Sequence, residues 1–187
     1  KNLGRSFIRN IISERNAGKF TSFYNFCSRM HGSDFNKRAV ESLIKSGALD
    51  GLGANRRQML MAMNEIIDEL DSKKRRNVEG QIGLFDSVGG ESYSESALKF
   101  FDEFPQSELL AMEKSTTGLY LSGHPMASHA ELAASMGCVR IAELANSGEN
   151  IHSSHKDGER TKIMGIITDV KKKITKSDTT MAFVDVE

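Results

Sequence analysis

The 187-residue sequence contains no tryptophan, two prolines and two cysteines. Cys27 and Cys138 lie far apart and lack the spacing of a metal site, so we expect free thiols in a reducing cytosol. No apolar run approaches the roughly 18 residues that a membrane-spanning helix needs. No charged start followed by a short apolar stretch marks a signal peptide. We therefore predict a cytoplasmic protein without a membrane partner.

The ends of the sequence indicate a part of a longer protein. The chain opens on Lys1 rather than on methionine, and it stops within the alternating run 182–187, where no turn signal occurs. Hydrophobic residues make up 39% of the sequence, which suits one large domain or two small ones. We expect a fragment of a larger protein.

The net charge of zero hides a strong asymmetry. Residues 1–76 hold 15 Lys and Arg against 8 Asp and Glu, whereas residues 77–187 hold 10 against 17. A basic part followed by an acidic part favours a polyanionic partner for the first part. A helical surface that is merely solvated explains the same charge, and the charge alone leaves both interpretations open.

Hydrophobic residues recur at helical spacing in the first 70 residues. They predict helices over residues 5–15, 21–30, 37–46 and 55–70. The apolar face expected for the first helix consists of Phe7, Ile8, Ile11 and Ile12. Asn36 is a good N-cap for the third helix, and Thr21 can cap the second. Met59 and Met63 lie in the fourth stripe, where methionine is typical of core packing.

The remainder of the chain is less regular. Residues 72–98, rich in charge, glycine and serine, predict a linker or a long exposed loop. A helix is expected from Pro105 to about Leu121. Shorter elements follow: a helix over 129–135, a strand-like piece over 138–141, a helical turn over 141–145 and a polar linker over 147–160. Two strands over 162–170 and 180–186, joined by a turn at 171–178, are marginal alone and predict part of a larger β-domain.

The first residues carry a pattern typical of a DNA-binding turn. Gly4 opens the spacing Gly-x-x-x-Ile-x-x-Ile, which resembles the second half of a helix-hairpin-helix motif. A glycine lets the backbone approach a phosphate closely, and the first amides of a helix attract anions. The predicted DNA contacts here are Leu3, Gly4, Arg5, Ser6 and Arg9.

A second, degenerate copy of the hairpin is predicted downstream. Residues 37–46 form its first helix, residues 51–53 its hairpin, and the residues from Asn55 onward its second helix. Its predicted contacts are Gly51, Gly53, Arg56 and Arg57, which would position the protein on a duplex without reading its sequence. An ordinary αα-hairpin, whose glycines only permit tight packing, stays open as an alternative.

A short peptide after the basic run 73–76 ends in two large apolar side chains. Its sequence is Gln81-Ile82-Gly83-Leu84-Phe85, and a Gly/Ser-rich segment follows it. Because such surroundings are unlike a core, we predict that Leu84 and Phe85 fill a pocket of another protein. The pattern Gln-x-x-Leu-Phe resembles the peptide by which bacterial replication proteins bind the sliding clamp.

Four segments resemble, in the same order, the alpha subunit of bacterial DNA polymerase III, a replicative polymerase of the C-family. They are Phe20 to Cys27, Asn36 to Gly53, Glu113-Lys114 with Gly118 to Pro125, and Met164 to Ile167 with Met181 to Val184. The resemblance extends over essentially all 187 residues.

The resemblance implies a mainly α fold in four parts. These are a tandem helix-hairpin-helix region over 1–72, a linker with the clamp-binding motif over 73–103, a helical connecting segment over 104–146, and a linker with the first strands of a truncated OB-fold β-barrel over 147–187. It implies that Gln81, Ile82, Leu84 and Phe85 bind the sliding clamp. Further implied partners are double-stranded DNA, other replicase subunits and, through a complete OB-fold, single-stranded template. The implied role is processive DNA replication at the nucleoid.

The resemblance implies a DNA-directed DNA polymerase, a nucleotidyltransferase that uses Mg²⁺, as the parent protein. The family's catalytic aspartates belong to a palm domain upstream, so we expect no catalytic residue, metal ligand or cofactor in this segment. The sequence offers no phosphate loop, and Asp68, Glu69 and Asp71 fit a solvated helix end better than a Mg²⁺ site. Two alternatives stay open: an autonomous helix-hairpin-helix adaptor, and a nuclease-associated DNA-binding region that would need acidic metal ligands.

Overall fold

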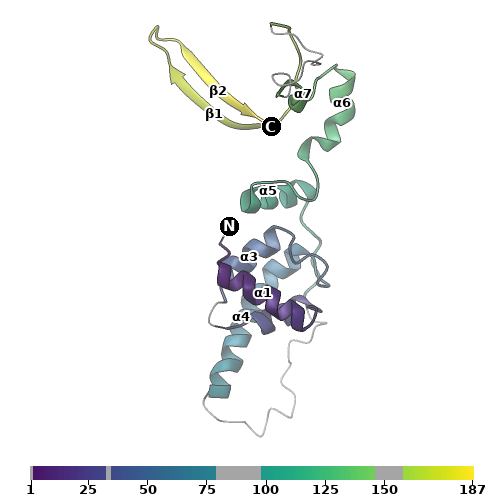
Figure 1. Ribbon diagram of the computed structural model, residues 1–187, viewed down its shortest axis with the longest axis vertical. Helices are drawn as coiled ribbons and strands as arrows, with labels where there is room; N and C mark the ends of the chain where they lie inside the picture. The colour runs from purple at the N-terminus through teal and green to yellow at the C-terminus, as the bar shows by residue number, and fades with distance from the viewer. Residues whose placement is uncertain (1, 33–34, 79–97, 146–157) are drawn as a thin grey trace. The chain divides into compact units, whose positions relative to one another are not determined.

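The computed structural model describes residues 2–32, 35–78, 98–145 and 158–187. The chain divides into two compact units, Lys1–Ser122 and Gly123–Glu187 (Figure 1). The first unit is helical, and the second ends in one pair of antiparallel strands. The prediction of a mainly α chain that ends in two strands is confirmed.

The described residues of the first unit form five helices. They are α1 Arg5–Ala17, α2 Phe23–Met30, α3 Lys37–Lys45, α4 Arg56–Val78 and α5 Gln106–Thr117. Asn36 caps α3 as predicted, because its side chain accepts a hydrogen bond from the Arg38 amide at 2.9 Å. The cap of α2 is Ser22 rather than Thr21, since the Ser22 hydroxyl accepts from the Asn25 amide at 3.0 Å.

The core of the first unit lies between α1, α2, α3 and α4. Its largest fully buried apolar side chains come from α2, α3 and α4: Phe23, Phe26, Cys27, Val40, Ile44, Met59 and Ile66. Each such side chain contributes about 1.5–3 kcal/mol through burial. Burial also raises the pKa of the Cys27 thiol to about 12. The expectation for α1 holds only in part, because Ile8 and Ile12 are 41% and 43% exposed.

Helix α4 is longer than its apolar stripe predicts. It continues past Leu70 to Val78, so the basic run 73–76 belongs to the helix. Lys73 stabilises this extension, because its ammonium pairs with Glu69 at 2.6 Å and donates to the Tyr24 hydroxyl at 3.0 Å. The domain boundary that we placed after residue 72 therefore falls inside a helix.

Residues 98–122 belong to the first unit rather than to a linker and a separate connecting segment. Leu98 packs against the hydrophobic core, and residues 99–105 lead into α5. Helix α5 ends at Thr117 instead of near Leu121, because Gly118 adopts a left-handed conformation with φ of 86° and donates to the Lys114 carbonyl.

The second unit begins with short helical pieces and ends in a hairpin. Its elements are the 3₁₀-helix η1 Pro125–His129, α6 Ala130–Ser135, α7 Ile141–Ala145, β1 Ile167–Ile174 and β2 Thr180–Val186. No strand forms over the described residues 138–140, although the Val139 amide donates to the Lys162 carbonyl at 2.8 Å. Strand β1 starts later than predicted and includes the lysines of the expected turn, with Lys171 opposite Phe183. Every residue of both strands is exposed.

Candidate nucleic-acid interface

The start of α1 is held in place by the residues before it. Asn2, whose φ is 63°, donates from its side-chain amide to the Ser42 hydroxyl of α3 at 3.1 Å. Leu3 is half-buried and packs against the core. These two contacts fix the turn from which Gly4 leads into the helix.

Neither the backbone conformation nor the packing at position 4 requires a glycine. Its φ of −77° and ψ of 153° suit any residue, and a Cβ atom would meet only the Ser6 hydroxyl oxygen, at 3.8 Å. Within the described residues no side chain caps this end of α1. Gly4 thus leaves the first amides of α1 open to a group that lies outside the chain.

The basic side chains around this turn face solvent. Arg5, Ser6 and Arg9 are all exposed, at the end of α1 where the helix dipole is positive. The structure therefore brings together all five residues that we predicted for the first hairpin: Leu3, Gly4, Arg5, Ser6 and Arg9. Open amides, a small residue and two guanidinium groups make an arrangement that suits a phosphate oxygen.

The second hairpin joins α3 to α4 through residues 46–55. Gly51 and Gly53 have φ of 91° and 78°, and the space around both is open, so their own backbone geometry calls for glycine. Gly47, with φ of 76°, has an additional reason, because a Cβ atom there would collide with the guanidinium of Arg56.

Arg56 points into the molecule, which corrects the expectation that it faces a phosphate. Its side chain is 5% exposed, and its guanidinium pairs with Asp50 at 2.8 Å and with Glu113 at 2.9 Å. These hydrogen bonds, the one to Asp50 foremost, raise the pKa of Arg56. A sequence signal for this burial exists: Arg56 lies three and seven residues before Met59 and Met63, on the apolar stripe of α4.

Glu113 of α5 connects this arginine to the end of the first unit. The carboxylate is fully buried; one oxygen accepts from Arg56, and the other accepts from the Leu121 and Ser122 amides at 2.7 and 2.9 Å. Burial alone raises the pKa of a carboxyl group, but these bonds outweigh it and lower the pKa of Glu113 to about 2. Glu113 therefore attaches the residues after Gly118 to Arg56 of α4.

The first amides of α4 are occupied, unlike those of α1. Glu103 accepts hydrogen bonds from the Arg56 amide at 2.9 Å and from the Arg57 amide at 3.1 Å. Asn55 and Gln58 form a reciprocal capping box, in which each side chain accepts from the amide of the other residue. The predicted phosphate position at this hairpin is therefore filled by a carboxylate of the same chain.

The side chain of Arg57, unlike that of Arg56, is exposed. Its guanidinium lies 6.0 Å from the ring centre of Phe101 and 5.6 Å from that of Phe104. These two rings flank Glu103 in the sequence, so the segment that caps α4 also positions Arg57. Glu103 was missing from our prediction because it lies 47 residues from Arg56 and follows no local spacing rule.

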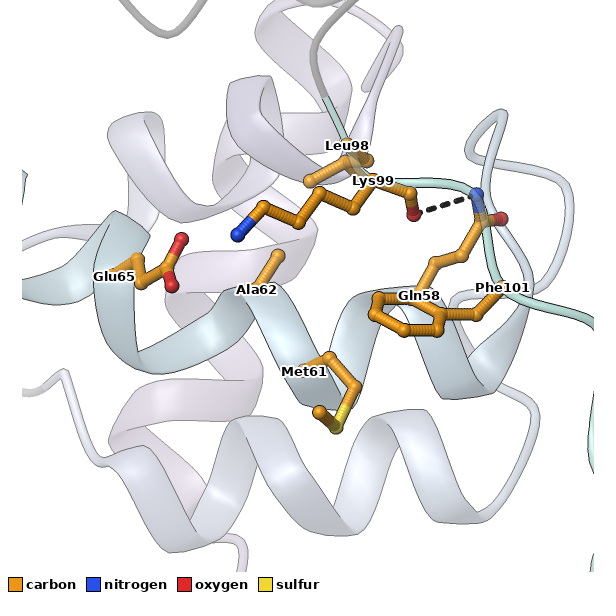
Figure 2. Close-up of a pocket in the computed structure, with 7 residues that line it drawn as sticks. All are labelled: Gln58, Met61, Ala62, Glu65, Leu98, Lys99 and Phe101. Atoms are coloured by element: carbon orange, nitrogen blue, oxygen red, sulfur yellow. Dashed lines mark hydrogen bonds between the residues drawn. The ribbon is translucent and has the colours of Figure 1, made fainter.

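A small pocket lies beside this segment (Figure 2). It measures about 80 Å³ and is lined by Gln58, Met61, Ala62, Glu65, Leu98, Lys99 and Phe101. The Gln58 side chain donates to the Lys99 carbonyl at 3.2 Å, and the ammonium of Lys99 points toward Glu65. The volume is far below the roughly 300 Å³ of a typical small-molecule site, so this is a packing groove rather than a nucleotide pocket.

The predicted clamp-binding residues Gln81, Ile82, Leu84 and Phe85 lie outside the described residues. In the described part of the chain, no group of His, Cys, Asp and Glu side chains is placed to hold a metal ion. Of the acidic cluster, Glu69 pairs with Lys73 and Asp71 with His31. None of the helices in the same part is long and apolar enough for a membrane span.

Comparison with known proteins places the first 59 residues, which include both glycine-containing turns, in a recognised motif. The family model described as a helix-hairpin-helix motif matches residues 1–59. The prediction of a helix-hairpin-helix region at the start of the chain is confirmed by this match.

The whole chain is similar to DNA polymerase III subunit alpha of Saccharopolyspora erythraea, with 34% identity over 100% of this chain and 16% of that protein. The subunit alpha of Deinococcus radiodurans is 34% identical over 97% of this chain and 14% of that protein. The subunit alpha of Xylella fastidiosa strain 9a5c is 37% identical over 67% of this chain and 11% of that protein. The chain thus spans about a sixth or less of the length of these relatives.

Proposed function

Because the chain belongs to the alpha subunit family of DNA polymerase III, we propose that it is a non-catalytic segment of a replicative DNA polymerase. Its task is to hold duplex DNA through the helix-hairpin-helix region and the sliding clamp through Gln81 to Phe85. The polymerase reaction, with its Mg²⁺, belongs to other parts of the parent protein.

The observation that carries the DNA-binding part is the open start of α1. Gly4 has no internal reason to be glycine, the amides after it are uncapped within the described residues, and Arg5 and Arg9 are exposed beside it. A phosphate accounts for all three features at once, because it needs close backbone approach, free donors and positive charge. Such contacts give affinity without sequence preference.

The second unit supplies a weaker argument for contact with single-stranded template. Lys171 and Lys173 lie opposite Phe183 and Met181 across the hairpin, and the Lys173 ammonium lies 5.4 Å from the Phe183 ring centre. A basic and aromatic sheet face is typical of OB-folds that stack unpaired bases. We propose that β1 and β2 contribute to such a fold in the parent protein.

Titration of a labelled 20-base-pair duplex against the chain at several salt concentrations tests the DNA-binding role. Replacing Arg5 or Arg9 by alanine is expected to weaken binding and to reduce the salt slope by about one for each phosphate that is no longer neutralised. Arg15→Ala is the matched control, because Arg15 is exposed at the far end of the same helix. A duplex affinity that does not depend on salt concentration, or equal losses of affinity in all three variants, contradicts the role.

Clamp binding is tested separately with Leu84→Ala combined with Phe85→Ala. Clamp affinity should be abolished while the melting temperature stays unchanged, because apolar anchors carry most of the binding energy of such short peptides. Val88→Ala, in the same polar segment, is the control. Retained affinity in the double variant removes the clamp from the proposal but leaves DNA binding untouched. Binding of clamp and DNA together raises the effective concentration of each, which is the physical basis of processivity.

A further inference from the structure

The carboxylate of Glu103 occupies the position at which the second hairpin would hold a phosphate. Its two oxygens each accept from one of the first two amides of α4, and one oxygen also accepts from the Phe104 amide at 2.9 Å. A carboxylate from a later segment of the chain thus caps α4. The same amides cannot serve Glu103 and a DNA phosphate at once.

The segment around Glu103 is fixed to α4 by its backbone. The Asn55 side chain donates to the Phe101 carbonyl at 2.7 Å, and the Gln58 side chain donates to the Lys99 carbonyl at 3.2 Å. Leu98 packs on the core. Because these contacts do not involve the Glu103 carboxylate, we expect the segment to stay in place when that carboxylate is removed.

The other groups that a phosphate needs are present at the same end of α4. Arg57 is exposed, and its guanidinium is held over the rings of Phe101 and Phe104, on either side of Glu103 in the sequence. Gly51 and Gly53 are exposed in the turn that precedes the helix. The donors and the positive charge of a phosphate site are therefore in place, and the Glu103 carboxylate supplies the anion.

We propose that Glu103 is an internal substitute for a DNA phosphate that silences the second hairpin, so that the chain grips a duplex through the first hairpin alone. Removal of the Glu103 carboxylate opens a second phosphate site, formed by the amides of Arg56 and Arg57 together with the Arg57 guanidinium. The inference rests on the proposed duplex-binding function and specifies which of the two hairpins performs it.

Duplex affinity of Glu103→Ala, compared with Asp102→Ala, tests the proposal on the full chain. Asp102 is exposed and adjacent, so its removal changes the net charge equally without freeing the α4 amides. We expect Glu103→Ala to bind a 20-base-pair duplex about three- to tenfold more tightly at low salt, with a salt slope steeper by about one. Asp102→Ala should keep the wild-type slope. Amide NMR signals of Arg56 and Arg57 should shift with duplex in Glu103→Ala.

Equal affinities and slopes for the two variants, or unshifted Arg56 and Arg57 amides in Glu103→Ala, overturn the proposal. If wild type and variants alike show no salt-dependent binding, duplex binding itself fails, and the silenced site fails with it. Thermal melting accompanies each titration. Should Glu103→Ala melt below the assay temperature, Glu103→Gln decides by the same criteria, because it keeps the shape of the side chain and removes its charge.

Discussion

Helices α1 and α4 both begin after a turn that contains glycine, yet their first amides have different partners. At α1 the glycine has an ordinary conformation, no side chain in the described residues caps the helix, and the nearby arginines face solvent. At α4 the glycines have left-handed conformations, a carboxylate binds the amides, and the first arginine is buried. One glycine-containing turn thus leads into a helix whose first amides face outward, and the other leads into a helix whose first amides bind a carboxylate of the same chain.

The difference shows that a motif does not determine its ligand. An anion-binding helix end can receive a phosphate from DNA or a carboxylate from a later part of the chain. In the second case the hairpin becomes a structural joint, because Glu103 and Glu113 both attach residues 98–122 to it. The predictions below exchange or remove the features that separate the two hairpins.

The largest change in stability is expected at Arg56, and its neighbour Arg57 provides the contrast. Arg56→Ala removes the partner of a fully buried carboxylate, and this should lower the free energy of unfolding by about 3–5 kcal/mol. Arg57→Ala removes an exposed side chain and should change it by about 0.5 kcal/mol or less. Urea unfolding of both variants at pH 7 measures the contrast. Equal losses of stability would mean that the buried pair does not stabilise the joint.

A pH dependence should follow from Glu113. Its pKa in the folded chain is about 2, below the ordinary value of 4.5, so its stabilisation is complete above pH 4.5 and is lost as the pH falls toward 2. The shift corresponds to roughly 3 kcal/mol. Urea unfolding from pH 6 to pH 2.5 should show a steeper decline for wild type than for Glu113→Gln. Parallel curves for the two proteins would contradict the assignment.

A smaller change in stability than those of Arg56→Ala and Glu113→Gln, but a decisive change in function, is expected from Gly4→Asp. This variant gives α1 the kind of carboxylate that α4 already has. An aspartate at the N-cap should raise the free energy of unfolding by about 0.5–1 kcal/mol, because it accepts from the open amides. The same contact should displace phosphate and weaken duplex binding at least tenfold. Ser13→Asp, which adds the same charge farther along α1, is the control; similar weakening in both variants would show that charge alone acts.

Local sequence rules predict the starts of the helices better than their ends and partners. Asn36 was correctly predicted as the N-cap of α3, because a capping side chain binds a backbone amide no more than three residues away. The extension of α4 was missed because Lys73 is held partly by Tyr24, 49 residues away. Our prediction placed Arg56 at a phosphate although its spacing matches the buried stripe of α4. Only the tertiary structure shows that Asp50 and Glu113 make such burial tolerable.

Local sequence rules likewise predict only one part of the candidate site. The residues from Leu3 to Arg9 are contiguous, so a local motif suffices to group them. The occupant of the second hairpin lies 46 or 47 residues from the amides that it binds, beyond the reach of periodicity or capping rules. Sequence similarity to the polymerase family identifies the region without specifying which of its hairpins is open.

The two cysteines have a practical consequence for measurement. Cys27 is fully buried in the core, and burial raises the pKa of its thiol to about 12. At neutral pH almost no thiolate is therefore present to react with an alkylating reagent. Cys138 is only partly covered and lies in the second unit. A maleimide dye should therefore attach to the natural sequence at one place, and energy transfer from a labelled duplex end would then report the separation between that unit and the DNA without any engineered residue.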